Sequence, residues 1–160
     1  MSRQPDSPNP PLPDETCEAI GKQLQLTLVE LIGLALAGKQ LQWNSYGREY
    51  VSVRRHLAQV VDEWRALEDV VAERAAVIGI ALEGTAAAVV ELDDHRSLEP
   101  GFTKVGDAIE RLCTQLWDVA VRVRQRGELL AGVDLVSQHV LIEVQRRLEA
   151  QLWMLRAQLE

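Results

Sequence analysis

The amino-acid sequence predicts an all-α protein folded as a four-helix bundle with one long crossover connection. Three observations predict this fold. Apolar residues recur at helical spacing in four long runs, no proline and few glycines interrupt these runs, and no segment alternates with period two. At 160 residues, with 47% hydrophobic and 26% charged residues, the chain has the size and composition of one soluble domain.

The first two predicted helices form a hairpin behind a proline-rich tail. Residues 1–13 hold five of the six prolines and predict a disordered tail, which leaves 14–160 as the folded domain. Asp14 is the predicted N-cap of a helix that ends near Asn44. A short turn leads to a second helix from about Arg48 to Ile78. The apolar stripes of the two helices include Ile20, Leu24, Leu28, Leu31, Leu34 and Ala35, then Val53, Leu57, Val60, Trp64, Leu67, Val71 and Ile78.

The second half of the chain predicts another helical hairpin after a long connection. Residues 82–101 break the helical pattern and predict a crossover that carries one short helix. Thr103 is expected to open the third helix, and residues 124–132 are expected to close it. Asp134 is the predicted N-cap of the fourth helix. The stripes here include Ile109, Leu112, Leu116, Val119 and Val123, then Val140, Val144, Leu148, Leu152 and Leu155.

Charge and cysteine content exclude some classes of function. The formal net charge is −7, and the N-terminal tail carries Arg3 alone as a basic residue, so we expect weak or no DNA binding. Cys17 and Cys113 lie in apolar helical patterns, which favours buried free thiols over a disulfide. No signal peptide or membrane span is indicated, so the expected location is the cytoplasm, with no membrane partner.

Three motifs in one order carry a family resemblance. They are K-Q-x-x-W-N-x-x-G at 39–47, D-x-x-A-E-R at 69–74 and G-x-x-x-x-G-T at 79–85. With the long crossover, they make residues 15–159 resemble the Dps-type mini-ferritins, which have the ferritin-like bundle. The resemblance implies a hollow dodecamer of twofold dimers that binds and stores iron and protects DNA during stress.

The resemblance also implies an iron-oxidising site between two subunits, and this sequence departs from it. The family uses two histidines and an aspartate from one subunit, and an aspartate and a glutamate from the other. The corresponding positions here are Gln42, Arg54, Ala58, Asp69 and Glu73. Only Asp69 and Glu73 are retained. Alanine has no ligand atom, arginine stays cationic and glutamine offers only a weak neutral oxygen, so we expect weak or absent ferroxidase activity.

Arg54 suggests what has replaced the metal. Arg54 and Asp69 are fifteen residues apart on one helix, about 22 Å, so they cannot meet within one chain. They can meet across a twofold axis between antiparallel copies of this helix. A guanidinium bridging Asp69 and Glu73 would supply the positive charge that iron supplies in the family, with Gln42 as a polar filler beside it. The alternative is that all five residues belong to a solvated face.

Other candidate residues have two readings each. Trp43 either packs or takes up oxidising equivalents near the iron site. Glu128 and Asp134 either line a cation pore at a threefold contact or serve as a helix end and an N-cap. His56 reads as a surface histidine rather than a rescuing ligand. His95 either holds a cation with Asp93 and Asp94 or lies in a solvated turn, and His139 reads as a local charge pair with Glu143. Arg122, Arg124 and Arg126 form a basic cluster near a helix end, where the helix dipole favours cations.

Two functions of different class remain open. The first is an iron-storing mini-ferritin whose intersubunit ferroxidase site is impaired. The second is a structural or mixed-shell subunit that acts through assembly or interaction and oxidises no iron.

Overall fold

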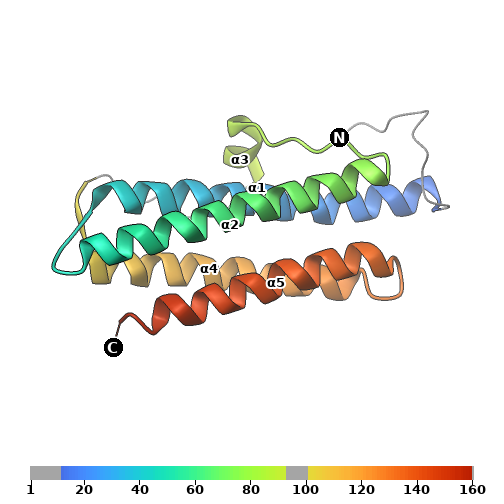
Figure 1. The fold of residues 1–160 in the computed structure, drawn as a ribbon. Helices are drawn as coiled ribbons and strands as arrows, with labels where there is room; N and C mark the ends of the chain where they lie inside the picture. Colours follow the sequence, from blue (N-terminus) through green and yellow to red (C-terminus); the bar gives the residue numbers. More distant parts are fainter. Residues whose placement is uncertain (1–11, 93–100, 160) are drawn as a thin grey trace.

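Two antiparallel helical hairpins pack against each other in the computed structural model, which describes residues 12–92 and 101–159. The first hairpin contains α1 (Asp14–Asn44) and α2 (Tyr50–Val77), and the second contains α4 (Val105–Leu129) and α5 (Leu135–Arg156). The short helix α3 (Ala86–Leu92) lies in the crossover, on the side of the first hairpin away from the second (Figure 1). The predicted four-helix bundle with an extra short helix is confirmed.

The core lies between the four long helices. Every residue of the predicted stripes is buried except Val140, which packs at the edge of the core. The indole of Trp64 is fully buried, and its Nε1 donates a hydrogen bond of 2.7 Å to Oε1 of Gln151. Gly38 allows α1 and α2 to approach closely, since a Cβ there would lie 2.6 Å from Cγ2 of Val61. The bundle therefore depends on one missing side chain as well as on apolar burial.

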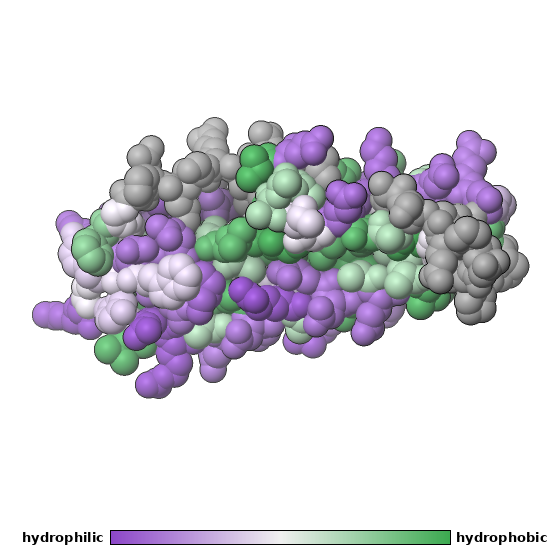
Figure 2. Space-filling model, turned by 90° about the horizontal axis from the view of Figure 1, so that it is seen from above, coloured by the Kyte–Doolittle hydropathy of each residue, from purple (hydrophilic) through white to green (hydrophobic). Residues whose placement is uncertain are grey.

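Helix α1 is apolar because neighbours cover it on several sides. It packs against α2 and α4, while Val29 and Ile32 on another face contact Ala88 and Val89 of α3. Within the described residues it is the one helix long and apolar enough to cross a membrane, and 61% of its most apolar window is buried in the bundle. A buried core helix meets the same criteria. Viewed from above, green hydrophobic residues run along the middle of the surface, beside a broad hydrophilic border (Figure 2).

Helix starts differ from the prediction in three places. Asp14 is not an N-cap, because Pro13 occupies that position and α1 begins at Asp14 itself. Helix α2 begins at Tyr50 rather than Arg48. Helix α4 begins at Val105, so the prediction that Thr103 opens it is wrong.

Thr103 instead belongs to a small parallel sheet that the sequence did not predict. Strand β1 (Ser45–Tyr46) pairs with β2 (Thr103–Lys104), with Ser45 opposite Thr103 and Tyr46 opposite Lys104. Strands of two residues are too short to show the alternation of apolar and polar residues that indicates a strand, so the sequence pattern could not predict this sheet. The pairing ties the α1–α2 turn to the start of α4.

Part of the sequence prediction falls outside the described residues. Residues 1–11 of the predicted tail and His95 belong to the parts that the structure does not describe. Leu12, the first described residue, packs against the core, and its carbonyl accepts a contact of 3.9 Å from Sγ of Cys17.

Candidate functional site

Four of the five candidate positions share one outward face of α2. Arg54, Ala58, Asp69 and Glu73 fall within about 100° of the helix circumference, opposite the buried stripe. Arg54, Asp69 and Glu73 are exposed and Ala58 is half-buried. Arg54 and Asp69 lie about 22 Å apart along the helix, so one chain does not bring the two halves of the site together.

Gln42 is buried and has two specific partners in its own chain. Its Nε2 donates a hydrogen bond of 3.2 Å to the backbone carbonyl of Arg54, and its Oε1 accepts one of 2.7 Å from Nζ of Lys39. These contacts join the end of α1 to the first turns of α2. Gln42 therefore has a structural role that the sequence did not indicate.

Two contacts between a cationic side chain and an aromatic ring lie near Gln42. The guanidinium of Arg54 lies 6.0 Å from the ring centroid of Tyr50, and Nζ of Lys39 lies 5.7 Å from that of Trp43. The side chain of Trp43 is exposed, so it packs less than a core tryptophan. Within residues 12–92 and 101–159, Arg54 forms no ion pair, which leaves its charge at the surface of the α2 face.

The described residues contain no group of three or more His, Cys, Asp or Glu side chains placed to hold a metal ion. Asp69 and Glu73, one helical turn apart, remain as two oxygen donors on the α2 face. Nδ1 of His56 lies 2.5 Å from Nε2 of Gln158, so this histidine has a partner at the C-terminal end of the chain. His56 is half-buried, whereas the sequence predicted a surface histidine.

The predicted pore residues have different environments. Glu128 is exposed near the end of α4. Asp134 caps α5, as predicted, by accepting a hydrogen bond of 2.8 Å from the Ser137 backbone N–H. It also forms a 2.7 Å ion pair with Arg74, whose Nε donates to Oγ of Ser137. The Asp134 carboxylate thus links α2 to the start of α5 within one subunit.

These contacts shift the pKa of Asp134. Burial acts to raise it, but hydrogen bonds from Ser137 and Arg74, with the positive charge of Arg74, outweigh burial and hold the pKa below its ordinary value of 3.8. A carboxyl group with a lowered pKa stabilises the folded state above its unfolded pKa, and this contribution is lost as the pH falls through the folded pKa.

We therefore expect the cost of Asp134→Asn to depend on pH. Asparagine keeps the cap but lacks the charge that pairs with Arg74, so the variant should be less stable than the parent at pH 7. The difference should shrink as the pH falls below 3.8. Urea denaturation at several pH values measures it. Asp134→Ala, which also removes the cap, should cost about 1–2 kcal/mol more than the asparagine variant at pH 7. A pH-independent difference between the asparagine variant and the parent would contradict the assignment.

A buried ion cluster joins α1 to α4. Glu30 accepts hydrogen bonds from Arg122 and Arg126, including one of 2.9 Å from Nη2 of Arg126. Arg126 also donates to Oγ1 of Thr27 at 3.3 Å. From the sequence, these arginines were predicted only to form a basic cluster near a helix end. The available signal was Glu30 itself, an acidic residue inside the apolar run LVELIGLAL.

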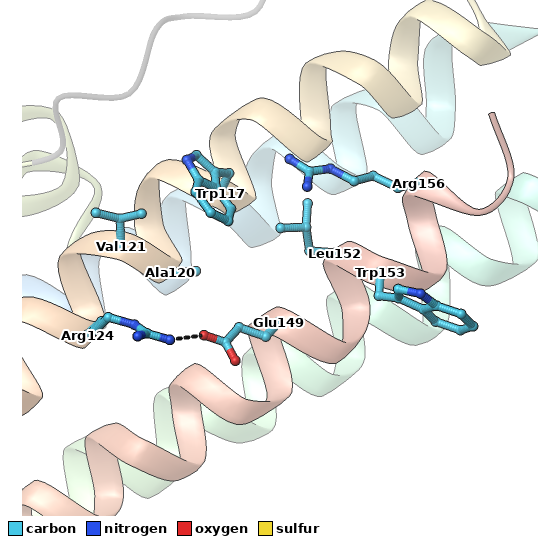
Figure 3. A pocket seen from close by; sticks show the side chains of 8 residues that line it. All are labelled: Trp117, Ala120, Val121, Arg124, Glu149, Leu152, Trp153 and Arg156. Carbon is cyan, nitrogen blue, oxygen red and sulfur yellow. Dashed lines mark hydrogen bonds and ion pairs between the residues drawn. The ribbon is translucent and has the colours of Figure 1, made fainter. Parts of the chain in front are cut away.

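An open hollow of about 500 Å³ lies between α4 and α5, away from the candidate iron site. The guanidinium of Arg156 lies 5.5 Å from the ring centroid of Trp117, while Arg124 pairs with Glu149 at 2.9 Å (Figure 3). Trp153 is exposed at its rim. The lining residues are Trp117, Ala120, Val121, Arg124, Glu149, Leu152, Trp153 and Arg156.

Comparison with known proteins defines the class to which this fold and site belong. A family model described as a ferritin-like domain matches residues 21–160, so the chain belongs to the ferritin-like family. Within that family it is a Dps-type mini-ferritin. It is 32% identical over 154 residues to the DNA protection during starvation protein of Mycolicibacterium smegmatis, covering 94% of this chain and 82% of that protein.

Other relatives agree with this placement. The solved structure of Mycobacterium smegmatis Dps superposes with a TM-score of 0.92 at 29% identity, covering 100% of this chain and 90% of that one. The fine tangled pili major subunit of Haemophilus ducreyi is 29% identical over 160 residues, which is 100% of this chain and 85% of that protein.

Proposed function

We propose that this protein is a cytoplasmic mini-ferritin shell subunit that stores iron and protects against iron-driven oxidative damage, with its intersubunit ferroxidase site impaired. Twelve copies form the shell from twofold dimers that meet through α2. One observation carries the proposal: Arg54 lies exposed on the same face as Asp69 and Glu73, with no ion pair in the described chain.

The chemistry of the five positions supports an impaired site. Across the twofold axis, Arg54 of one subunit approaches Asp69 and Glu73 of the other, and a guanidinium there excludes ferrous iron by charge. The amide of Gln42 is engaged with Lys39 and the Arg54 carbonyl, and Ala58 has no ligand atom. Iron, as the stored substrate, then enters and mineralises at other carboxylates.

The arginine contacts support weak or absent DNA binding. The basic cluster near the end of α4 has acidic partners, since Arg122 and Arg126 bind Glu30 and Arg124 binds Glu149. These pairs reduce the positive charge available for phosphate, and the net charge is −7. Protection would then act through iron removal rather than through contact with DNA.

The second candidate is a shell or mixed-shell subunit that oxidises no iron. The structural use of Gln42 favours it, because that side chain is held by partners within its own chain. One relative is named the fine tangled pili major subunit, and this name supports a structural role as the alternative.

Ferrous oxidation under oxygen distinguishes the two candidates. We expect purified protein to oxidise Fe²⁺ only slightly faster than a buffer blank, while ferric iron accumulates in the fraction that contains the shell. Absence of protein-bound iron after prolonged incubation would favour the structural subunit. Rapid oxidation with two irons bound among Gln42, Asp69 and Glu73 would overturn the salt-bridge proposal.

A further inference from the structure

The outward face of α2 carries charges in a self-complementary order. Arg54, Asp62, Arg65, Asp69 and Glu73 all fall on this face and are all exposed. In the described residues, none of the five forms a hydrogen bond or ion pair through its side chain. Their intramolecular interactions among the described residues are weaker ones, such as the contact of Arg54 with the Tyr50 ring and the Coulombic interaction of Arg65 and Asp69 with Glu68. The face therefore presents a row of charges that can still form ion pairs with a second copy.

The charges on this face are arranged symmetrically, with opposite signs, about a point midway between Glu63 and Trp64. Asp62 and Arg65 are equidistant from that midpoint and opposite in charge. Arg54 and Glu73 are also equidistant from it and opposite in charge. When two copies of α2 lie antiparallel about this point, each pair forms twice across the axis.

Other registers lose this match. A slide of about one turn in one direction places Asp62 opposite Asp69 of the other copy, which is repulsive. A slide of about one turn in the other direction keeps Arg54 near an acidic residue, Asp69, but separates Asp62 from Arg65. The centred register is the one of the three that satisfies both kinds of pair.

We propose that Asp62 and Arg65 form the central reciprocal ion pair of the twofold contact between two copies of this chain, and that they set its register and its choice of partner. This inference rests on the twofold dimer of the proposed function and adds residues outside the five ferroxidase positions. Exposed ion pairs add little affinity, whereas facing like charges are strongly unfavourable. The Asp62–Arg65 pair therefore favours association of chains with complementary charges in the centred register and disfavours chains or registers that bring like charges together.

Complementary charge reversals test the pair. Asp62→Arg alone and Arg65→Asp alone each place like charges opposite each other twice, so each variant should lose twofold association by at least about tenfold. Mixed together, the two variants form opposite-charge pairs at both places, and assembly should return with equal amounts of each. Native mass spectrometry of iron-free protein measures size and composition, and far-UV circular dichroism checks helicity.

The doubly reversed chain Asp62→Arg, Arg65→Asp should assemble with itself and exclude parent subunits. The matched control is Asp118→Arg, the same charge change at an exposed site on α4. Mixing Asp118→Arg with Arg65→Asp should not restore assembly. If it does, the effect depends on net charge alone, and the proposed register is wrong. Parent-like assembly of the single variants, or no rescue on mixing them, would also overturn it. The ferrous oxidation experiment and the charge-reversal experiment measure different properties. Failure of either one therefore does not change the interpretation of the other.

Discussion

Glu30→Ala is expected to lower the free energy of unfolding by about 3–5 kcal/mol, because it leaves Arg126 buried without its counter-charge. The Arg126 side chain is only 9% exposed and donates to both carboxylate oxygens of Glu30. Arg122 would lose the same partner. Denaturant unfolding followed by circular dichroism, at fixed protein concentration and with the assembly state recorded, measures the loss.

A surface ion pair of the same chemistry provides the control. Glu149→Ala removes the partner of Arg124, but the two side chains are 47% and 58% exposed. Water replaces the lost contact, so the cost should be about 0–1 kcal/mol. Equal costs for Glu30→Ala and Glu149→Ala would show that the Glu30 cluster is no more important than a surface pair.

Gln42→His, Arg54→His and Ala58→Asp together are expected to create a working intersubunit iron site. They place two imidazoles and a carboxylate opposite Asp69 and Glu73 of the other subunit and remove the competing guanidinium. Metal affinity should rise by at least about 100-fold, since even the groups that only orient a ligand affect affinity 10- to 100-fold. Titration with Co²⁺ measures binding, and stopped-flow absorbance measures ferrous oxidation.

The matched control adds Asp69→Asn and Glu73→Gln to the same triple variant. The three new ligands remain, but the opposite carboxylates become neutral amides of similar size, so the gain in binding and oxidation should disappear. A gain that survives these changes would place the metal elsewhere. No gain in the triple variant itself would mean that the two faces of α2 do not meet as proposed.

The fold was predictable because burial follows helical periodicity. The predicted apolar positions lie in the core, apart from Val140 at its edge, and Asp134 caps α5 as its side-chain chemistry predicts. The errors concern short-range features. The two-residue sheet that contains Thr103 shows no period, and Pro13 takes the capping position expected for Asp14 because proline suits a helix entrance.

The candidate site was less predictable because its polar partners are distant in sequence. Spacing placed Arg54, Asp69 and Glu73 on one continuous helix, and in the structure all three are exposed on α2. Periodicity could not show that Gln42 binds the carbonyl of Arg54, or that Glu30 binds Arg126, because such contacts depend on how helices pack. For Glu30, an acidic residue inside an apolar run was the available clue.

The contact between Gln42 and Arg54 affects how these two positions can evolve. Gln42 binds the backbone carbonyl of residue 54, which every amino acid retains, so the side chain at position 54 is free to change without disturbing the contact. Position 42 has no such freedom, because its side chain must supply the N–H. Arg54 can therefore be replaced without loss of this contact, whereas a replacement at position 42 keeps the contact only if the new side chain also donates there. An imidazole N–H can do so while its other ring nitrogen faces outward, so histidine is one of the few metal-ligand residues that are compatible with this contact.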